Sequence, residues 1–313
     1  MHNRILTHQP PGMAIILTCV DHAAVPVDNR PVPSRVRCGR REQRRGLWVV
    51  GPRPLFPLLV SYKVLRYTAF VKGETEDMHE NDDVALSLRY HGLTDLPAAL
   101  GQYTSLQQLD VTGNALAALP TNAGNLLQLK KLCLDDNALT ALPSWFGDML
   151  QLEEIHLDGN QLASLPENIG QLTNLKILSA YNNRLTALPA SLTGLTGLRE
   201  LSVGGNQLTS LPESFWQLTN LRLLNVAENR LSSLSERIGN LTQLVTLDVG
   251  HNELAALPDS LGNLKNLTFY LYLSNNRLTA LPDSLGNLSE LRYLNATDNQ
   301  LTTLPETLGN LAS

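Results

Sequence analysis

Three side chains with metal-binding or nucleophilic chemistry recur at one spacing in this chain. Asp110, Cys133 and His156 follow one another at intervals of 23 residues. Carboxylate, thiolate and imidazole groups all bind zinc, and a cysteine close to a histidine is the pair from which a thiolate nucleophile is formed. The sequence has no Cys-x-x-Cys or His-x-x-His spacing that supports a metal centre. We therefore keep zinc binding and a Cys133 nucleophile as alternatives only, and predict no catalytic residue, no metal and no cofactor.

Acidic side chains gather around the same three positions. Like charges at this density raise one another's pKa, and they favour a partner with a basic surface. The competing interpretation is an acidic surface that faces only solvent. The candidate partner-binding residues of this first group are Asp110, Asp135, Asp136, Glu154, His156 and Asp158.

A second group of candidate binding residues extends toward the carboxyl end and is rich in tyrosine. Tyrosine is enriched at protein interfaces because it buries a large area at a small cost in side-chain entropy. The competing interpretation is that these rings shield neighbouring leucines. The group consists of Tyr181, Asp248, His251, Tyr270, Tyr272, Tyr293 and Asn295.

Both groups occupy variable positions of a 23-residue repeat. One unit reads L-x-x-L-x-L-x-x-N-x-L-x-x-L-P-x-x-L-G-x-L-x-x, and residues 152–174 match it closely. Leucines at fixed offsets with a period of about 20 to 29 residues are typical of a stacked solenoid. A weaker first unit begins near Asp83, which makes ten units within residues 78–313. The other units begin at Leu106, Leu129, Leu152, Leu175, Leu198, Leu221, Leu244, Leu267 and Leu291.

The alternation of apolar and polar residues in the segment x-L-x-L-x predicts one short strand per unit, with the leucines pointing inward. One unit alone cannot cover its own leucines, so we expect the strands to stack into a parallel sheet. The unit that begins at Leu267 has one additional residue. We expect Phe269 or Tyr270 to be extruded there in a bulge.

An asparagine recurs at the ninth position of each unit, where the chain leaves the strand. A buried carboxamide at this point can satisfy backbone groups of its own and of adjacent turns, which would otherwise cost about 1 to 3 kcal/mol each. We interpret these residues as structural. They are Asn114, Asn137, Asn160, Asn183, Asn206, Asn229, Asn252, Asn276 and Asn299.

This pattern resembles the 23-residue leucine-rich repeats of the intracellular Ras-group family, a class found in Ras-binding scaffolds, plant intracellular relatives and many bacterial proteins. The resemblance covers about 230 of the 313 residues. It implies an α/β solenoid, a horseshoe with a parallel concave β-sheet and an irregular or short-helical convex side. It also implies that the concave face binds another protein, and it implies no catalysis. The matching residues build the frame, so the resemblance says more about fold than about function.

Residues 1–77 have a different composition. They contain 12 Lys and Arg against 6 Asp and Glu, whereas the remainder contains 12 and 23. A basic tail suits nucleic acid or an anionic membrane, and the apolar run from Gly12 to Val20 is similar to a short secretion signal. A third interpretation is that Met78 is the true initiator. We expect this head to be disordered or absent from the genuine product, with no nucleic-acid binding and no membrane span.

The cysteine count and the carboxyl end bear on compartment and assembly. Three cysteines, of which only Cys133 lies in the repeats, are too few for the disulfide framework of a secreted domain. We predict a cytoplasmic protein, with a secreted bacterial effector as the alternative. The last unit has no polar cap, so we expect exposed leucines and self-association there, or a longer reading frame. These leucines are Leu301, Leu304, Leu308 and Leu311.

The function predicted from these observations is a non-enzymatic protein-binding module, a scaffold or regulator, that holds its partner on the concave face. The alternative is the target-recognition part of a bacterial effector or signalling enzyme whose catalytic domain is absent from this chain.

Overall fold

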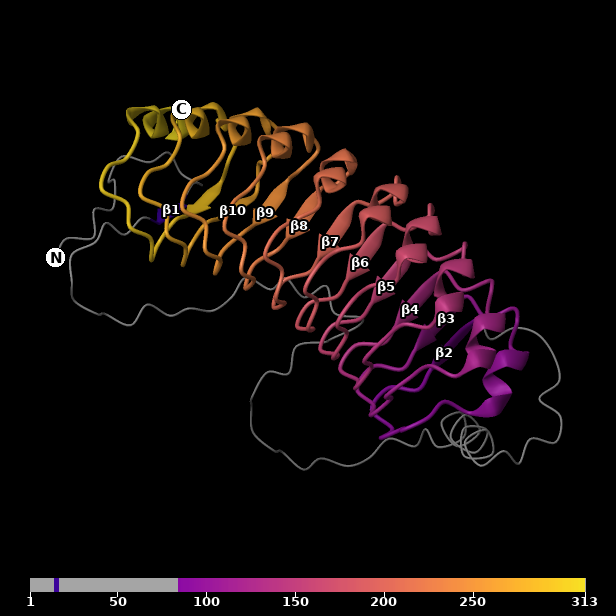
Figure 1. Ribbon diagram of the computed structural model, residues 1–313. Coiled ribbons are helices and arrows are strands. Elements are labelled where there is room, and N and C mark those ends of the chain that lie inside the picture. Colours follow the sequence, from indigo (N-terminus) through magenta and orange to yellow (C-terminus); the bar gives the residue numbers. More distant parts are fainter. Residues whose placement is uncertain (1–13, 17–83, 313) are drawn as a thin grey trace, which may run out of the picture.

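Ten short strands, one from each repeat, lie side by side in a curved parallel sheet (Figure 1). The computed structural model describes residues 14–16 and 84–312. The array confirms the predicted α/β solenoid of horseshoe form. The strands are β2 Ala85–Ser87, β3 Gln108–Asp110, β4 Lys131–Cys133, β5 Glu154–His156, β6 Ile177–Ser179, β7 Glu200–Ser202, β8 Leu223–Asn225, β9 Thr246–Asp248, β10 Tyr270–Tyr272 and β11 Tyr293–Asn295.

The register of the sheet repeats the sequence period. Leu132 in β4 is paired with Ile155 in β5, which is paired with Leu178 in β6. The middle residue of each of these three strands is at most 2% exposed. Because successive side chains point to opposite faces of a strand, the residues on either side of it face outward on the concave surface. The variable side chains of ten repeats thus share one face.

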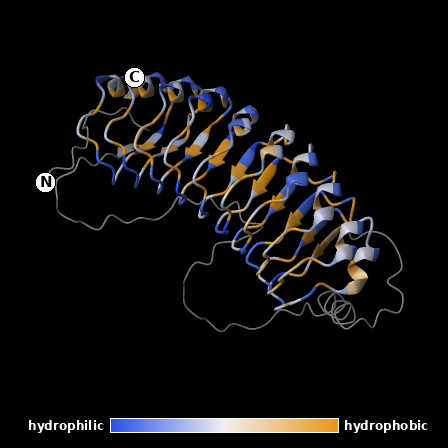
Figure 2. Ribbon diagram, in the orientation of Figure 1, coloured by the Kyte–Doolittle hydropathy of each residue, from blue (hydrophilic) through white to orange (hydrophobic). Residues whose placement is uncertain are grey.

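The core is an aliphatic column enclosed by the turns of the solenoid. The leucines that open the units are buried, as are Phe146, Phe215 and Trp216 on the convex side. Figure 2 shows hydrophobic segments along the middle of each turn and hydrophilic residues at the margins of the array. Burial of one leucine side chain contributes about 1.5 to 3 kcal/mol, so most of the stability comes from this column.

The convex side consists of short 3-10 helices, and each begins just after the recurrent proline or its serine replacement. Pro166 precedes η4 with φ −70° and ψ 146°, the extended conformation that a proline ring favours. Ser235 takes the place of proline before η7, and its Oγ accepts a hydrogen bond from the Arg237 N–H at 3.2 Å. The helices are η1 Ala98–Gln102, η2 Thr121–Asn125, η3 Ser144–Asp148, η4 Glu167–Gln171, η5 Ala190–Gly194, η6 Glu213–Gln217, η7 Glu236–Asn240, η8 Asp259–Asn263, η9 Asp283–Asn287 and η10 Glu306–Ala312.

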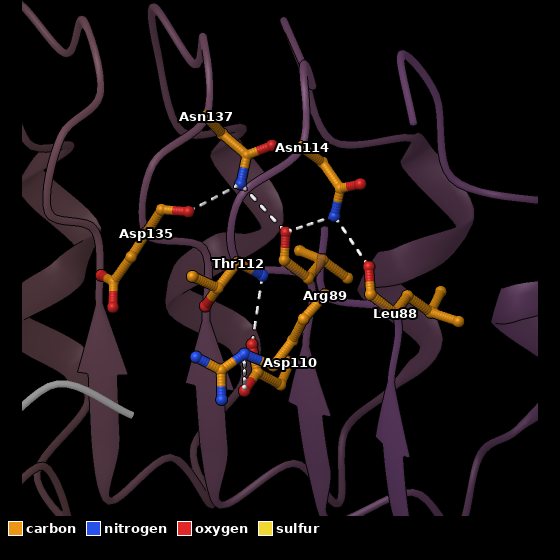
Figure 3. Close-up of polar contacts among 8 residues, drawn as sticks. Leu88, Arg89, Asp110, Thr112, Asn114, Asp135 and Asn137 are labelled. Carbon is orange, nitrogen blue, oxygen red and sulfur yellow. Dashed lines mark hydrogen bonds and ion pairs between the residues drawn. The ribbon is translucent and has the colours of Figure 1, made fainter. Parts of the chain in front are cut away.

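The recurrent asparagines join adjacent turns. Asn160 Nδ2 donates to the carbonyl of Leu157 in its own unit at 3.0 Å and to that of Leu134 in the preceding unit at 2.9 Å. Its Oδ1 accepts the Leu139 N–H at 3.0 Å. In Figure 3, Asn114 and Asn137 both direct their Nδ2 groups to one shared backbone carbonyl. Each turn that has a following unit is therefore hydrogen-bonded to the asparagine side chain of that unit.

The residue immediately before each asparagine has a left-handed backbone. Gly159 has φ 67°, Asp136 has φ 53° and Glu228 has φ 55°. This conformation is strained for a residue with a Cβ atom, which explains why glycine, asparagine and aspartate occur so often there. The turn fixes the direction in which the chain leaves the concave face.

An eleventh strand completes the sheet at its carboxyl-terminal end. β1, Ala14–Ile16, pairs in parallel with β11. The expectation of exposed terminal leucines was wrong, because Leu301, Leu308 and Leu311 are at most 4% exposed and Leu304 is half-buried. β1 lies along the last strand, and η10 packs against η9 and has seven residues where the other helices have five.

Most of the head, residues 1–13 and 17–83, lies outside the described residues. Its predicted disorder, or absence from the product, stays a prediction, and β1 is the part of it that the structure describes. Within the described part of the chain, no helix is long and apolar enough to cross a membrane.

Candidate partner-binding surface

The strand register brings the first group of predicted residues together. Asp110 is aligned with Cys133, and Cys133 with His156, at the ends of β3, β4 and β5. Arg89 in the first unit approaches Asp110 with Nε to Oδ2 at 3.5 Å (Figure 3). Arg89 was not among the residues predicted from the sequence, although its place one residue after the core leucine Leu88 marks it as outward-facing.

Asp135 is the most perturbed carboxylate of this group. Its side chain is buried, and Oδ1 accepts the Asp158 N–H at 2.8 Å. Burial raises the pKa of Asp135 to about 7, the charge of Asp158 adds to the shift, and the hydrogen bond opposes it. Asp136 and Asp110 raise it further. The prediction that neighbouring acids raise one another's pKa thus holds for Asp135, with burial as the larger cause.

Glu154, Lys131 and His156 form a second polar contact on the neighbouring strands. Lys131 Nζ donates to Glu154 Oε2, and His156 Nε2 lies 3.7 Å from the same oxygen. Burial acts to raise the pKa of Glu154, but the hydrogen bond and charge of Lys131 outweigh it, so that this pKa is lowered. Burial and the charge of Lys131 lower the pKa of His156, which favours a neutral imidazole. Its ring nitrogens have no hydrogen-bond partner among the described residues.

Polar contacts continue from the acidic group toward the middle of the sheet. Asp158 Oδ1 accepts bonds from Ser179 Oγ at 2.6 Å and from the Tyr181 N–H at 2.8 Å. The Tyr181 hydroxyl donates to Glu228 Oε1 at 2.7 Å, two units further on. Sequence reasoning missed Glu228, because its position in the left-handed turn resembles a purely structural one. Its acidic side chain, in place of glycine or asparagine, was the available signal.

Four predicted binding residues lie at the last position of a strand or in the turn that follows a strand. Asp136 and His251 occupy the left-handed turn that follows a strand. The ring of His251 contacts Asn275, with 3.2 Å between Nε2 and Nδ2. Asp248 and Asn295 end β9 and β11, and each accepts the N–H of the residue two places later at 3.0 Å. Burial raises the pKa of Asp248 to about 6.

The tyrosines of β10 and β11 form an aromatic cluster, which we define as Tyr270, Tyr272 and Tyr293. The ring centroids of Tyr272 and Tyr293 are 5.2 Å apart, and each lies 5.6 Å from that of Tyr270. Burial, followed by the other two tyrosines, raises the pKa of Tyr272. All three rings are half-buried, so each retains an accessible edge.

The additional residue of the eighth unit lies beside this cluster. Tyr270 is in regular register with Thr246 and Tyr293, whereas Phe269 precedes the strand and is 43% exposed. The ring of Phe269 meets that of Tyr270 edge-on at 4.8 Å, and Arg292 lies over its other side with 5.7 Å from Cζ to the centroid. Of the two residues considered, Tyr270 keeps the regular register, and Phe269 is the exposed one, with its N–H donating to the Val245 carbonyl at 3.1 Å.

The zinc and nucleophile alternatives depend on Cys133. Within residues 84–312, no group of three or more His, Cys, Asp or Glu side chains is arranged to hold a metal ion. Cys133 is disulfide-bonded, and its partner lies outside the described residues. A sulfur held in a disulfide is neither a thiolate ligand nor a nucleophile.

Comparison with known families identifies the repeat. A family model described as a leucine rich repeat matches residues 104–162, 151–208 and 173–231, and one described as a leucine-rich repeat region matches residues 207–313. The chain is a leucine-rich repeat protein. A search of curated protein sequences gave no significant match.

Solved leucine-rich repeat structures are similar to this chain. The ectodomain of the plant membrane receptor kinase GASSHO1/SCHENGEN3 from Arabidopsis thaliana, in complex with CASPARIAN STRIP INTEGRITY FACTOR 2, is 34% identical with a TM-score of 0.60, covering 66% of this chain and 26% of that one. A TDR receptor is 27% identical with a TM-score of 0.60, covering 72% and 45%. The functional domain of InlJ from Listeria monocytogenes is 23% identical with a TM-score of 0.59. The match covers 69% of this chain and 44% of that one, and at this identity it shows the fold alone. This leucine-rich repeat protein spans less than half the length of each.

Proposed function

We propose that this leucine-rich repeat protein is a non-enzymatic binding module that holds a protein partner on its concave face in a scaffold or regulatory role. The observation that carries the proposal is the aromatic cluster, in which three half-buried tyrosines contact one another on the outward positions of adjacent strands. Such clusters bury much area on binding at a small entropic cost. The structure of the GASSHO1/SCHENGEN3 ectodomain in complex with CASPARIAN STRIP INTEGRITY FACTOR 2 supports a binding role.

The acidic group supports a partner with a basic surface. Asp135 is buried with a raised pKa, and Asp158 and Asp136 stand beside it. A cationic side chain placed near Asp135 would favour its charged form, so we expect binding to release a proton below pH about 7. We further propose that the repeats are of the intracellular Ras-group type.

Partner capture with two sets of variants tests the proposal. The first set, Asp136→Lys with Asp158→Asn, changes the charge of the acidic group, while the carboxamide introduced by the second substitution retains an acceptor oxygen. The second set, Tyr270→Ala with Tyr293→Ala, removes rings from the aromatic cluster. We expect each set to weaken capture at least about tenfold, the loss of a hot-spot contact. The matched controls are Glu167→Lys in η4 on the convex side and Tyr90→Ala in the loop after β2, both exposed residues. Capture that is unchanged by both sets, or reduced equally by the controls, refutes the concave-face proposal.

A second candidate is the target-recognition part of a longer effector or signalling enzyme. The GASSHO1/SCHENGEN3 structure is the leucine-rich repeat ectodomain of a membrane receptor kinase, which is the observation in its favour. The coding sequence beyond Ser313 distinguishes the two candidates. A kinase, ligase or GTPase domain in the same frame supports the second, and a stop codon followed by an unrelated gene supports the first.

The compartment is proposed on separate grounds. The small number of cysteines favours the cytoplasm, whereas the disulfide of Cys133 favours an oxidising compartment and hence the secreted alternative. Acid quenching of intact cells, followed by alkylation of Cys133 under denaturing conditions, distinguishes them, because this sulfur is buried in the folded protein. Labelling supports the cytoplasm, and labelling only after reduction supports secretion.

A further inference from the structure

The two edges of the sheet differ in what lies beside them. β1 is added to the outer edge of β11, at the opposite end of the sheet from β2 (Figure 1). Ala14 is aligned with Tyr293, and Ile16 with Asn295. β11 is therefore an internal strand of the sheet, although it is the last strand in chain order.

The backbone of β11 explains why an added strand fits. In earlier units, the carbonyl of the second residue accepts N–H groups from the next unit, as Lys130 does from Glu154 at 2.9 Å. The N–H of the sixth residue donates forward, as Leu134 does to His156 at 2.8 Å. The equivalent groups of the last repeat are the Arg292 carbonyl and the Ala296 N–H. Among the described residues, no strand follows β11 in the chain to pair with these two groups. Unpaired groups at such an edge favour the addition of another strand.

The register of β1 reproduces that of a following repeat. Ala14 is related to Tyr293 as Glu154 is to Lys131, and both pairs are parallel. Ala14 is thus at the place from which Glu154 donates its N–H to the preceding unit.

We propose that the outer edge of β11 is a strand-binding site, which accepts a short aliphatic segment in parallel register and which β1 of the same chain occupies. Three paired residues make few hydrogen bonds, so a segment of the same pattern supplied in trans can exchange with β1. The 68 residues between β1 and β2 keep β1 tethered, which favours it over β1 of a second copy at ordinary concentrations. Because the site consists of backbone groups, this proposal does not rest on the partner-binding role of the concave face.

Hydrogen exchange of the full chain tests occupancy by β1. Ala14→Pro removes the N–H that register directs toward β11, whereas Ala14→Val retains it and favours a strand. We expect the Ala296 amide to exchange at least about tenfold faster in Ala14→Pro than in Ala14→Val, with the amides of β6 unchanged in both. Equal protection of Ala296 in the two variants overturns the proposal.

A peptide in trans tests the site itself. The probe is a fluorescent peptide of residues 12–18, GMAIILT, with added lysines for solubility. We expect it to bind Ala14→Pro, to restore protection of Ala296 there, and to bind the unsubstituted chain at least about tenfold more weakly. A peptide with proline in place of Ala14 is expected not to bind. Failure of the first peptide to bind Ala14→Pro, or equal binding of both peptides, overturns the strand-binding site. A dimer of the unsubstituted chain in light scattering that dissociates on Ala14→Pro overturns the assignment to the same chain.

Discussion

At the scale of single residues, the buried asparagines do more for the fold than their neutral side chains suggest. One carboxamide satisfies backbone groups in two successive units, as Asn160 does for Leu134 and Leu157. A buried backbone group that loses its partner costs about 1 to 3 kcal/mol. Loss of one such side chain therefore leaves several unpaired groups in the core.

We expect Asn160→Ala to lower the free energy of unfolding by about 2 to 4 kcal/mol, because carbonyls of two units lose their donor. Asn114→Ala serves as the comparison. That asparagine is less buried and lies near the end of the array, so its loss should cost less. Denaturation by guanidinium chloride, followed by circular dichroism, measures both. Equal losses at the two positions contradict the ranking by burial.

The second prediction at this scale concerns Asp135. Its pKa in the folded protein, about 7, is above the ordinary value of 3.8. Between these pH values the folded protein retains a proton that the unfolded chain has released, so the free energy of unfolding falls as pH rises and levels off above about pH 7. Asp135→Asn has no titrating carboxylate at this position, so its free energy of unfolding should not fall in this way. We expect this free energy to exceed that of the wild type by about 1 to 4 kcal/mol at pH about 8 and to equal it at pH about 3.

Thermal unfolding across this pH range measures the effect. The control is Asp136→Asn, an exposed neighbour in the following turn. A difference between wild type and Asp135→Asn that does not change with pH contradicts the raised pKa.

Residue-scale features were the hardest to predict. The 23-residue spacing predicted that Asp110, Cys133 and His156 occupy equivalent positions on successive strands, and the strand register aligns them. The burial of Asp135 was not readable, since it depends on how tightly the turn packs against its neighbours. The contact between Tyr181 and Glu228 spans 47 positions and depends on curvature, which no pattern in one unit encodes.

At the scale of elements, the repeat predicts strands and turns well because each position has one physical task. The leucine period gave the strand positions, and the extra residue of the eighth unit gave the site of the bulge. The family resemblance implied an irregular or short-helical convex side, but the bounds of the 3-10 helices could not be predicted, because a segment of five residues is too short to show a helical period. Ser235 stands where the other units have proline, and η7 still forms, because the serine hydroxyl caps this helix by a hydrogen bond.

Deletion of Phe269 tests the bulge. Removal of this exposed residue restores the spacing of the other units, so we expect a folded protein whose free energy of unfolding changes by no more than about 1 kcal/mol. Deletion of Leu271 restores the same length but removes the inward residue of β10, which should destabilise the protein by about 2 to 5 kcal/mol. Thermal unfolding of both variants provides the comparison. A strongly destabilised Phe269 deletion shows that the residue has a role in packing.

At the scale of the whole molecule, the array is quasi-one-dimensional. Each unit contacts its neighbours through the sheet, the helices and the shared asparagines, so the energetics are nearly additive along the array. The contact between β1 and β11, in contrast, joins segments that are distant in the sequence. A periodic pattern could not have predicted it, because residues 14–16 lie outside the repeat.

This additivity predicts that a complete unit can be removed. Deletion of residues 175–197 joins Asn174 to Leu198 and preserves the phase of every repeat. We expect a folded, cooperative protein whose urea m-value is lower by roughly a tenth, in proportion to the surface lost. Deletion of residues 175–186 breaks the phase and should abolish cooperative unfolding. Retention of a cooperative transition by the out-of-phase variant contradicts this account.

Each recurrent asparagine bonds back to the preceding unit, and this has a consequence for synthesis on the ribosome. The Leu139 N–H is satisfied only by Asn160 of the following unit, so each newly made turn stays incomplete until a further repeat has left the exit tunnel. Folding should therefore trail translation by about one repeat, beginning from the amino-terminal units. β1 is translated before every repeat, yet its place in the sheet exists only after β11 has been made. The first strand to emerge is thus the last to pair.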